Sequence, residues 1–328
     1  MHAVVLVCVI MIAFANDVTL VGSSSPMRQL RALIATVAPT RVPVLIEGET
    51  GTGKELVAAL LHRSSGRSGE FVAFNVCAIG DSMFEDALFG HTKGAYTGAL
   101  SESLGFLREA NGGTAFLDEI SGLPLALQAK LLRAIETGVF RPIGASRDAR
   151  SDFRPIAATN ESLTMLVDAG RFRADLRHRL SGIVLRLPSL TERADDIPEL
   201  VAHFIRATGR ALQLSADALT LLQETPWPGN VRELKQVVDS AVVFARTALD
   251  REAVETAMIH RTPASRTRIS GGARLAERTE LVHVLERADW NAERAATTLG
   301  IHRATMYRRL KRHGIDVRAE TLARANRR

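Results

Sequence analysis

A glycine-rich run that directly follows a short apolar segment constrains this chain more than any other feature. Residues 42–46 are rich in β-branched side chains, as in a buried strand, and residues 55–61 favour a helix. The run between them is Gly48, Glu49, Thr50, Gly51, Thr52, Gly53, Lys54 and Glu55. Between a strand and a helix, such a loop directs backbone N–H groups and a helix N-terminus at phosphate oxygens. We therefore predict an ATP site here, with Lys54 at the β- and γ-phosphates.

A second apolar segment, residues 114–117, ends in two carboxylates, Asp118 and Glu119. Paired with the phosphate loop, they predict that Asp118 holds Mg²⁺ and that Glu119 polarises the attacking water. Asn160 ends a further strand and is placed to orient this water or to sense the γ-phosphate. Considered alone, acidic residues after a strand are often only solvated, and an asparagine there is usually a turn residue.

Strand and helix patterns alternate over the first half of the chain. Strands are predicted at residues 42–46, 71–74, 114–117 and 153–158, with helices between them. This alternation is typical of an α/β fold in which helices cover both faces of a parallel sheet. After Pro188 we expect no more strands but three helices, at residues 197–208, 215–224 and 231–246, and we expect Ser215 and Asn230 to cap the last two. The second part is thus a helical lid.

The charge of the chain is unevenly distributed. The 328 residues carry a formal net charge of +6, but residues 261–328 alone hold 16 basic and 7 acidic residues, which leaves −3 for the rest. Such asymmetry indicates a nucleic-acid-binding appendage. Helical patterns at 292–299 and 303–312 around Gly300 predict a helix-turn-helix for double-stranded DNA. The side chains expected to face the DNA are Arg303, Thr305, Arg308, Arg309 and Arg312.

Residues 88–99 carry the most specific motif, and with the phosphate loop they identify a family. The chain from about residue 20 to 315 resembles the sigma-54-dependent transcriptional activators, or bacterial enhancer-binding proteins, with an AAA+ ATPase domain and a Fis-type C-terminal domain. The resemblance implies that one loop contacts sigma-54, and its residues are Gly94, Ala95, Tyr96, Thr97, Gly98 and Ala99. The family carries Phe where Tyr96 stands, and usually Glu where Ala87 stands.

The resemblance also assigns residues around the nucleotide. Asn75 would restrain the catalytic Glu119, and Arg232 in the lid would reach the nucleotide as a sensor. Arg173 and Arg179 match arginine fingers that act on the nucleotide of a neighbouring subunit. From the residues alone, the arginine run at 171–179 is more often a solvated face. The family carries Glu at position 55, where other phosphate loops usually place a Ser or Thr that helps to hold Mg²⁺.

These observations divide the chain into an apolar segment (1–18), an α/β core (19–188), a lid (189–259), a linker (260–274) and a DNA-binding domain (275–328). The apolar segment is too short to span a bilayer and lacks the positive flank of a signal peptide. We therefore favour a buried strand or the remnant of an upstream domain, with a targeting or anchoring role as the alternative. We expect a cytoplasmic hexamer, without membrane contact, that remodels sigma-54 RNA polymerase at a promoter. The alternative is a DNA-binding AAA+ regulator that no longer engages sigma-54.

Overall fold

The computed structural model describes residues 19–80 and 83–259, together with isolated positions between 281 and 295. The chain divides into two compact units, residues 1–264 and 265–328, and the sheet, its helices and the lid belong to the first unit. The apolar segment 1–18, the linker 260–274 and the five residues predicted to face DNA (Arg303, Thr305, Arg308, Arg309 and Arg312) lie outside the described residues. Within the described part, no helix is long and apolar enough to cross a membrane.

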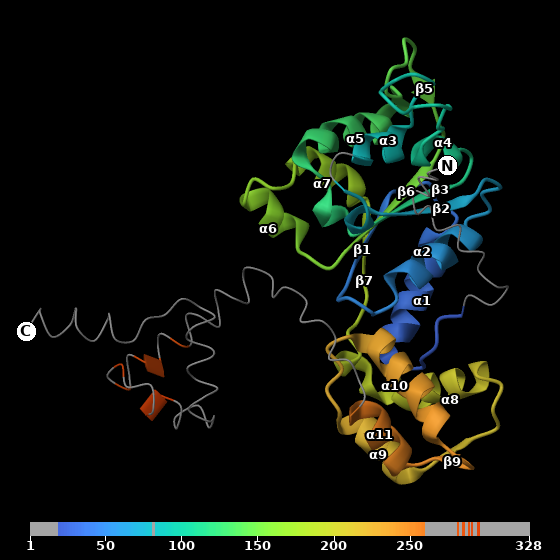
Figure 1. Ribbon diagram of the computed structural model, residues 1–328, viewed down its shortest axis with the longest axis vertical. Helices are drawn as coiled ribbons and strands as arrows, with labels where there is room; N and C mark the ends of the chain where they lie inside the picture. Colours follow the sequence, from blue (N-terminus) through green and yellow to red (C-terminus); the bar gives the residue numbers. More distant parts are fainter. Residues whose placement is uncertain are drawn as a thin grey trace, which may run out of the picture. The chain divides into compact units, whose positions relative to one another are not determined.

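A five-stranded parallel sheet forms the centre of the first unit, which confirms the predicted α/β fold (Figure 1). Its strands follow the order β2-β3-β6-β1-β7. They are β2 (Phe71–Asn75), β3 (Thr114–Asp118), β6 (Arg154–Thr159), β1 (Val44–Glu47) and β7 (Ile183–Arg186). The sequence predicted four of the five within two residues at either end. It missed β7, a four-residue edge strand whose pattern is too short to recognise.

Helices cover both faces of this sheet. The helices on one face are α1 (Ser25–Val37) and α2 (Lys54–Arg63), and those on the other are α3 (Phe84–Phe89), α4 (Phe106–Glu109), α5 (Leu125–Thr137), α6 (Leu163–Asp168) and α7 (Ala174–Leu180). Side chains alternate along each strand, so Val44 and Ile46 pack with α1 and α2 while Leu45 packs with the opposite layer. Burial on both faces explains why β1 is apolar throughout.

Arg154, at the start of β6, is only 1% exposed and joins the sheet to helix α1. Its guanidinium donates to the carbonyl oxygens of Val37 at 3.0 Å, Ala38 at 2.6 Å and Val42 at 3.3 Å. The first two oxygens belong to the end of α1, where carbonyl groups lack helical partners and the helix dipole favours a cation. Arg154 therefore fixes α1 against β6, the strand that pairs with β1 and precedes Asn160.

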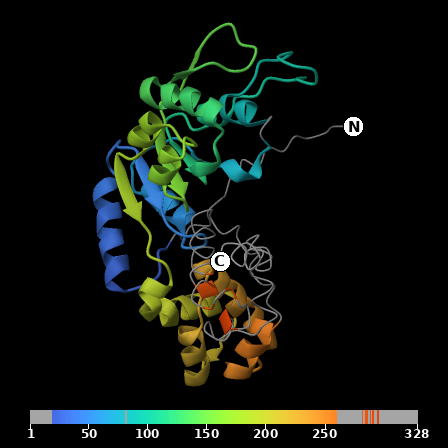
Figure 2. The ribbon, with the colours of Figure 1, turned by 90° about the vertical axis from the view of Figure 1, so that its left-hand side faces the viewer.

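The lid consists of α8 (Ile197–Ala207), α9 (Ala216–Glu224), α10 (Asn230–Phe244) and α11 (Arg251–Ile259), which group together in Figures 1 and 2. They enclose an apolar core of their own. The Ser215 hydroxyl accepts from the backbone N–H of Ala218, which confirms this predicted cap. The expectation of no further strands was wrong, because two-residue strands β8 (Gln213–Leu214) and β9 (Ala248–Leu249) pair in parallel.

Candidate nucleotide site and contact loop

The strand order brings the predicted nucleotide residues to one edge of the sheet. In a parallel sheet all carboxyl ends lie at the same edge, and ligands bind in the crevice outside them. Strand β6 lies between β1 and β3. The phosphate loop follows β1, Asp118 ends β3, and Asn160 follows β6. Asn160 is therefore placed between the phosphate loop and the carboxylates. Its side-chain amide donates to Thr50 Oγ1 of the loop at 3.1 Å, and its backbone N–H donates to the carboxylate of Glu119.

Lys54 lies in the centre of the phosphate loop with its ammonium group turned into the loop. The side chain is 7% exposed, and Nζ donates to the carbonyl oxygens of Gly48 at 3.0 Å and Glu49 at 3.4 Å. Nζ also lies 3.7 Å from Glu119 Oε1. Gly53 precedes Lys54 with a φ of 105°, a conformation that favours glycine. The loop thus places a buried cation and the N-terminus of α2 at the same point.

Two carboxylates face Lys54, and burial raises the pKa of both. For Asp118 the burial is opposed by the nearby Lys54 cation. For Glu119 burial acts first, Lys54 opposes it, and the charge of Asp118 adds to it. Glu119 has a φ of 53°, a left-handed conformation that costs a non-glycine residue energy and is typical of functional sites. This turn directs its carboxylate at Lys54.

Asn75 ends β2 opposite Asp118 in the sheet register. Its side-chain N–H donates to Asp118 Oδ2 at 3.4 Å, and its side-chain oxygen accepts from the backbone N–H of Cys77 at 2.9 Å. The resemblance paired Asn75 with Glu119 instead. In this structure the left-handed backbone of Glu119 turns its carboxylate toward Lys54, so the amide contacts the other carboxylate.

The lid is joined directly to the phosphate loop. The backbone N–H of Arg232 donates to the Gly51 carbonyl at 3.2 Å. The Asn230 amide donates to the Glu49 carboxylate at 2.9 Å and to the Thr50 carbonyl at 3.1 Å. The predicted cap at Asn230 was wrong: Gly229 is the N-cap, and the Asn230 oxygen accepts from the backbone N–H of Leu190. These long-range partners compete successfully with the local cap.

Glycine at position 51 is required by this close approach. A Cβ atom there would lie 2.2 Å from the carbonyl oxygen of Gly229, and the φ of Gly51 is 83°. Thr52 is buried, and its hydroxyl donates to the Glu49 carbonyl at 2.8 Å. The Thr52 carbonyl accepts from the Arg193 guanidinium at 3.1 Å. Positions 48 and 49 thus contact Lys54, and positions 49–52 contact the lid. These contacts leave the outer side of the loop to the ligand.

A cavity of about 420 Å³ lies over these groups. Its lining includes the predicted Thr50, Gly51, Gly53, Lys54, Glu55, Asn75, Asp118, Glu119 and Arg232. The sequence missed four further lining residues, Leu56, Phe204, Val231 and Lys235. Lys235 follows Arg232 by three positions on α10, so a helical spacing of three could have found it. The ionic groups of the lining are three cations, Lys54, Arg232 and Lys235, and three carboxylates, Glu55, Asp118 and Glu119.

The carboxylates also suit a magnesium ion. Burial and the neighbouring charge of Asp118 raise the pKa of Glu55, and the Arg232 cation opposes them. Among the described residues, no group of three or more ligating side chains could hold an ion unaided. Mg²⁺ usually binds through one or two carboxylates, substrate phosphates and water. The donor set at Asp118 fits that requirement.

Arg173 and Arg179 do not line the cavity of their own chain. Arg173 precedes helix α7 and Arg179 belongs to it, and both are exposed. Arg173 makes two hydrogen bonds with the Asp175 carboxylate, at 3.1 and 2.8 Å. The exposure agrees with the solvated face that the residues alone indicate, and it also leaves both side chains available to another subunit.

Arg193 is a buried arginine that the sequence did not single out. It is 4% exposed and lies in the short 3-10 helix η4 (Thr191–Asp196) at the start of the lid. Its Nη2 donates to the Thr52 carbonyl at 3.1 Å, and its Nη1 lies 3.0 Å from the sulfur of Met27 on α1. The neighbouring Asp196 accepts from Ser24 at 2.8 and 2.7 Å. These contacts join the lid to the phosphate loop and to α1.

The predicted contact loop projects beyond helix α3. Its base is closed by paired backbone hydrogen bonds of 3.0 Å between His91 and Ser103. At its tip the Gly94 N–H donates to the Ala99 carbonyl at 2.9 Å. Tyr96 is 47% exposed and Leu100 is 85% exposed. The loop thus presents an aromatic ring and an aliphatic side chain to solvent, as expected of a protein contact.

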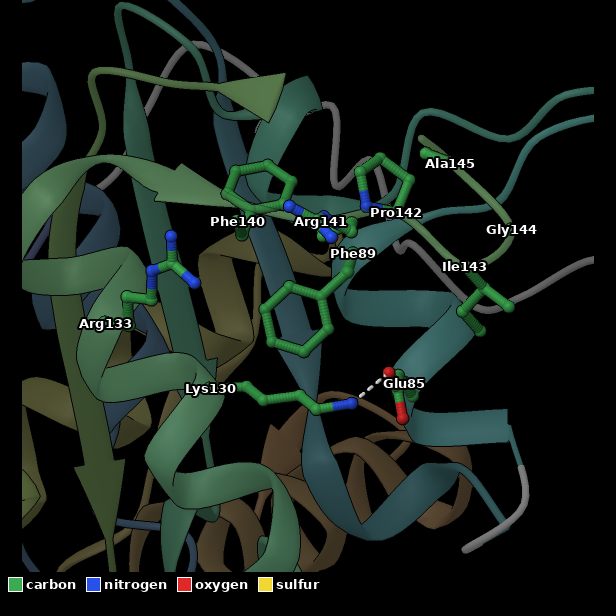
Figure 3. Close-up of a pocket in the computed structure, with 10 residues that line it drawn as sticks. All are labelled: Glu85, Phe89, Lys130, Arg133, Phe140, Arg141, Pro142, Ile143, Gly144 and Ala145. Carbon is green, nitrogen blue, oxygen red and sulfur yellow. Dashed lines mark hydrogen bonds and ion pairs between the residues drawn. The ribbon is translucent and has the colours of Figure 1, made fainter. Parts of the chain in front are cut away.

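A second cavity, of about 460 Å³, lies beside this loop (Figure 3). Phe89 and Phe140 contribute aromatic rings 5.8 Å apart. Lys130 is ion-paired with Glu85, as the dashed line in Figure 3 marks, and Asp148 pairs with Arg133 and Arg141. Because each lining cation already has a carboxylate, the cavity offers little to an anion. Ile143 at its edge bonds Gly90 and Thr92 through its backbone, which braces the contact loop.

Comparison with known proteins gives consistent relatives. Family profiles match the "Sigma-54 interaction domain" at residues 20–186, the "AAA+ ATPase lid domain" at 191–270 and the "Bacterial regulatory protein, Fis family" at 273–313. The chain is 39% identical to regulatory protein LuxO of Vibrio cholerae over 331 residues, and 41% identical to the DNA-binding transcriptional regulator NtrC of Rhizobium meliloti over 256 residues. These alignments cover 92% and 76% of this chain, but only 62% and 53% of the relatives.

A solved structure is also similar. NtrX from Brucella abortus in complex with ADP matches with a TM-score of 0.68 and 31% identity, over 91% of this chain and 70% of that one. RuvB of Thermotoga maritima matches at 17% identity with a TM-score of 0.50, a likeness that concerns the fold alone. The chain therefore spans about half to two thirds of the length of the first two relatives, and its matched regions carry the loop, the lid and the C-terminal segment.

Proposed function

This chain belongs to the sigma-54-dependent transcriptional activators, and from that premise we propose that it hydrolyses ATP to remodel sigma-54 RNA polymerase at a promoter. The observation that carries the proposal is the convergence of the phosphate loop, Asp118, Glu119 and Arg232 on one cavity, in a chain that also carries the contact loop. Enhancer binding through residues 275–328 completes the proposal. We retain the division into 1–18, 19–188, 189–259, 260–274 and 275–328 as our proposed organisation.

The groups around the cavity suit the hydrolysis of a nucleoside triphosphate. The loop N–H groups and the N-terminus of α2 would bind phosphate oxygens, and Lys54 would turn from its loop carbonyls to the β- and γ-phosphates. Asp118 would hold Mg²⁺, which neutralises charge on the phosphates. Glu119 would accept a proton from the attacking water, and Asn160, which contacts both Glu119 and Thr50, would orient that water.

The arginine fingers require more than one subunit. Arg173 and Arg179 are exposed and absent from the lining of their own cavity. We propose that they reach the γ-phosphate of a neighbour in a ring, by analogy a hexamer, where a guanidinium stabilises charge that develops during transfer. Hydrolysis would then depend on assembly.

Capture of sigma-54 tests the proposal. The full chain is incubated with ADP, aluminium fluoride and purified sigma-54, and complexes are separated on a native gel. We expect capture by the wild type and loss of capture by Thr97→Ala, since Thr97 is exposed at the loop tip. Thr220→Ala is the matched control, because this exposed threonine lies on α9 and bonds only its own helix, at Ala216.

Two results would contradict the proposal. Absence of capture by the wild type, with ATP hydrolysis retained, would favour a DNA-binding AAA+ regulator that does not engage sigma-54. Equal loss of capture in Thr97→Ala and Thr220→Ala would show that the loop has no special part in the contact.

A further inference from the structure

Tyr96, the aromatic residue of the contact loop, is attached to the preceding helix through its hydroxyl group. The hydroxyl donates to Asp86 Oδ2 at 3.1 Å, and Asp86 belongs to α3. The Tyr96 ring lies 5.1 Å from the His91 ring, at an interplanar angle of 59°. Burial and the neighbouring Asp86 carboxylate raise the pKa of Tyr96, so the phenol stays protonated and remains a donor.

His91 holds the other oxygen of the same carboxylate. Its Nδ1 lies 2.5 Å from Asp86 Oδ1, and its Nε2 lies 3.0 Å from the carbonyl oxygen of Ser101. Both ring nitrogens thus have an oxygen partner, so the imidazole ring is held between α3 and the strand-like base of the loop. Because His91 is 9% exposed and its backbone is paired with Ser103, the carboxylate is fixed from the rigid base of the loop.

We propose that Asp86 and His91 are positioning residues that hold the hydroxyl of Tyr96, and with it the tip of the contact loop, against helix α3 before sigma-54 is engaged. The inference rests on the proposed function for the role of the loop. A phenylalanine ring could still pack on His91 but has no donor for Asp86. The tether is therefore a property of tyrosine at position 96.

Helix α3 is a suitable place for such a tether. It begins shortly after Asn75, which ends β2 and bonds Asp118 in the nucleotide site. A displacement of α3 would carry Asp86 with it, and the hydrogen bond would either pull Tyr96 along or break. The Asp86 carboxylate would thus pass a displacement of α3 to the loop tip.

Limited trypsin digestion tests the tether without sigma-54. Lys93 is exposed and directly precedes the tip, and cleavage after it requires local release of the loop. In Tyr96→Phe we expect this cleavage, followed by mass spectrometry of the fragment that starts at Gly94, to be about three- to tenfold faster, the effect of one hydrogen bond. Tyr307→Phe, the same chemical change at the second tyrosine of the chain, is the control and should cleave at the wild-type rate.

A second variant separates positioning from general destabilisation. Asp86→Ser should accelerate cleavage at least as much as Tyr96→Phe, because it removes the bonds to both Tyr96 and His91. The double variant should be no faster than Asp86→Ser, because the bond that Tyr96→Phe removes is already absent from it. Equal rates in wild type and Tyr96→Phe, or strictly additive effects in the double variant, would overturn the tether. Sigma-54 capture is then measured on the same proteins: if the wild type captures none while the cleavage rates differ as expected, the proposed function fails and the tether stands.

Discussion

Replacing Arg154 by methionine would remove the guanidinium that joins β6 to α1 while leaving a side chain of similar length. The carbonyl oxygen of Ala38, a residue that is 0% exposed, would lose its donor. The carbonyl oxygen of Val37 would still accept from the backbone N–H and the hydroxyl of Thr40, at 3.1 and 2.8 Å. Each buried acceptor left without a partner costs about 1–3 kcal/mol. The third acceptor, on the exposed Val42, can be hydrated instead.

Part of this loss is offset, because burial lowers the pKa of Arg154 and methionine removes the cost of a buried cation. We therefore expect Arg154→Met to lower the free energy of unfolding by about 1–2 kcal/mol, which for a domain of this size lowers Tm by roughly 2–8 °C. Circular dichroism melts and urea titrations would measure the change.

Arg133→Met is the matched control. Arg133 is exposed and pairs only with Asp148, and exposed pairs contribute about 0–1 kcal/mol. Arg154→Lys, with three donors on one nitrogen, should be intermediate. A Tm of Arg154→Met equal to or above that of the control would refute the argument that the buried Ala38 carbonyl depends on this side chain.

Two further predictions concern the nucleotide site. The pKa of Asp118 is raised in the folded chain, so ionisation of this carboxyl group opposes folding. Asp118→Asn should therefore raise the Tm of the nucleotide-free protein at pH 7. The difference in Tm between the variant and the wild type should vanish as the pH falls below the ordinary aspartate pKa near 3.8. Asp148→Asn is the control and should lower Tm at pH 7, because hydrogen bonding to Arg141 lowers the pKa of Asp148. A fall of Tm in Asp118→Asn at pH 7 would contradict the reasoning. Arg173→Ala and Lys54→Ala should each abolish ATP hydrolysis when tested alone. A mixture of the two variants should recover part of the activity, because Lys54→Ala subunits still supply Arg173 to the intact nucleotide site of a neighbouring Arg173→Ala subunit. If a phosphate-release assay of mixed oligomers shows no recovery, the arginine fingers do not act between subunits.

The sequence predicted the parts of this site whose signals are contiguous. Strand, glycine loop and helix follow one another at residues 42–61, so their pattern alone specifies the phosphate loop. Asp118 could be predicted because it directly follows the apolar residues 115–117 of its strand. Strand β7 escaped notice because four residues at a sheet edge, with Val184 37% exposed, give little pattern.

Residues whose partners lie far along the chain could not be predicted in the same way. Arginines are usually exposed, so nothing local distinguishes Arg154 or Arg193, whose acceptors lie more than 100 residues away. Asn230 shows how long-range partners override a local preference. Its position at the start of a helix favours a capping role, but in the folded chain its side chain makes hydrogen bonds with Leu190, Glu49 and Thr50. Local pattern gave the right helix and the wrong partner.

The contacts between lid and loop bear on how hydrolysis could be transmitted. Asn230 holds positions 49 and 50, the Arg232 N–H holds the carbonyl of Gly51, and Arg193 holds that of Thr52. Four consecutive loop positions are thus tied to the lid by polar groups, and a Cβ at Gly51 would already collide with Gly229. A shift of the loop on loss of the γ-phosphate would therefore move the lid or break these hydrogen bonds, of which the one between Arg193 and Thr52 is buried. Because an unpaired buried group costs about 1–3 kcal/mol, that bond opposes a shift of the loop that leaves the lid in place.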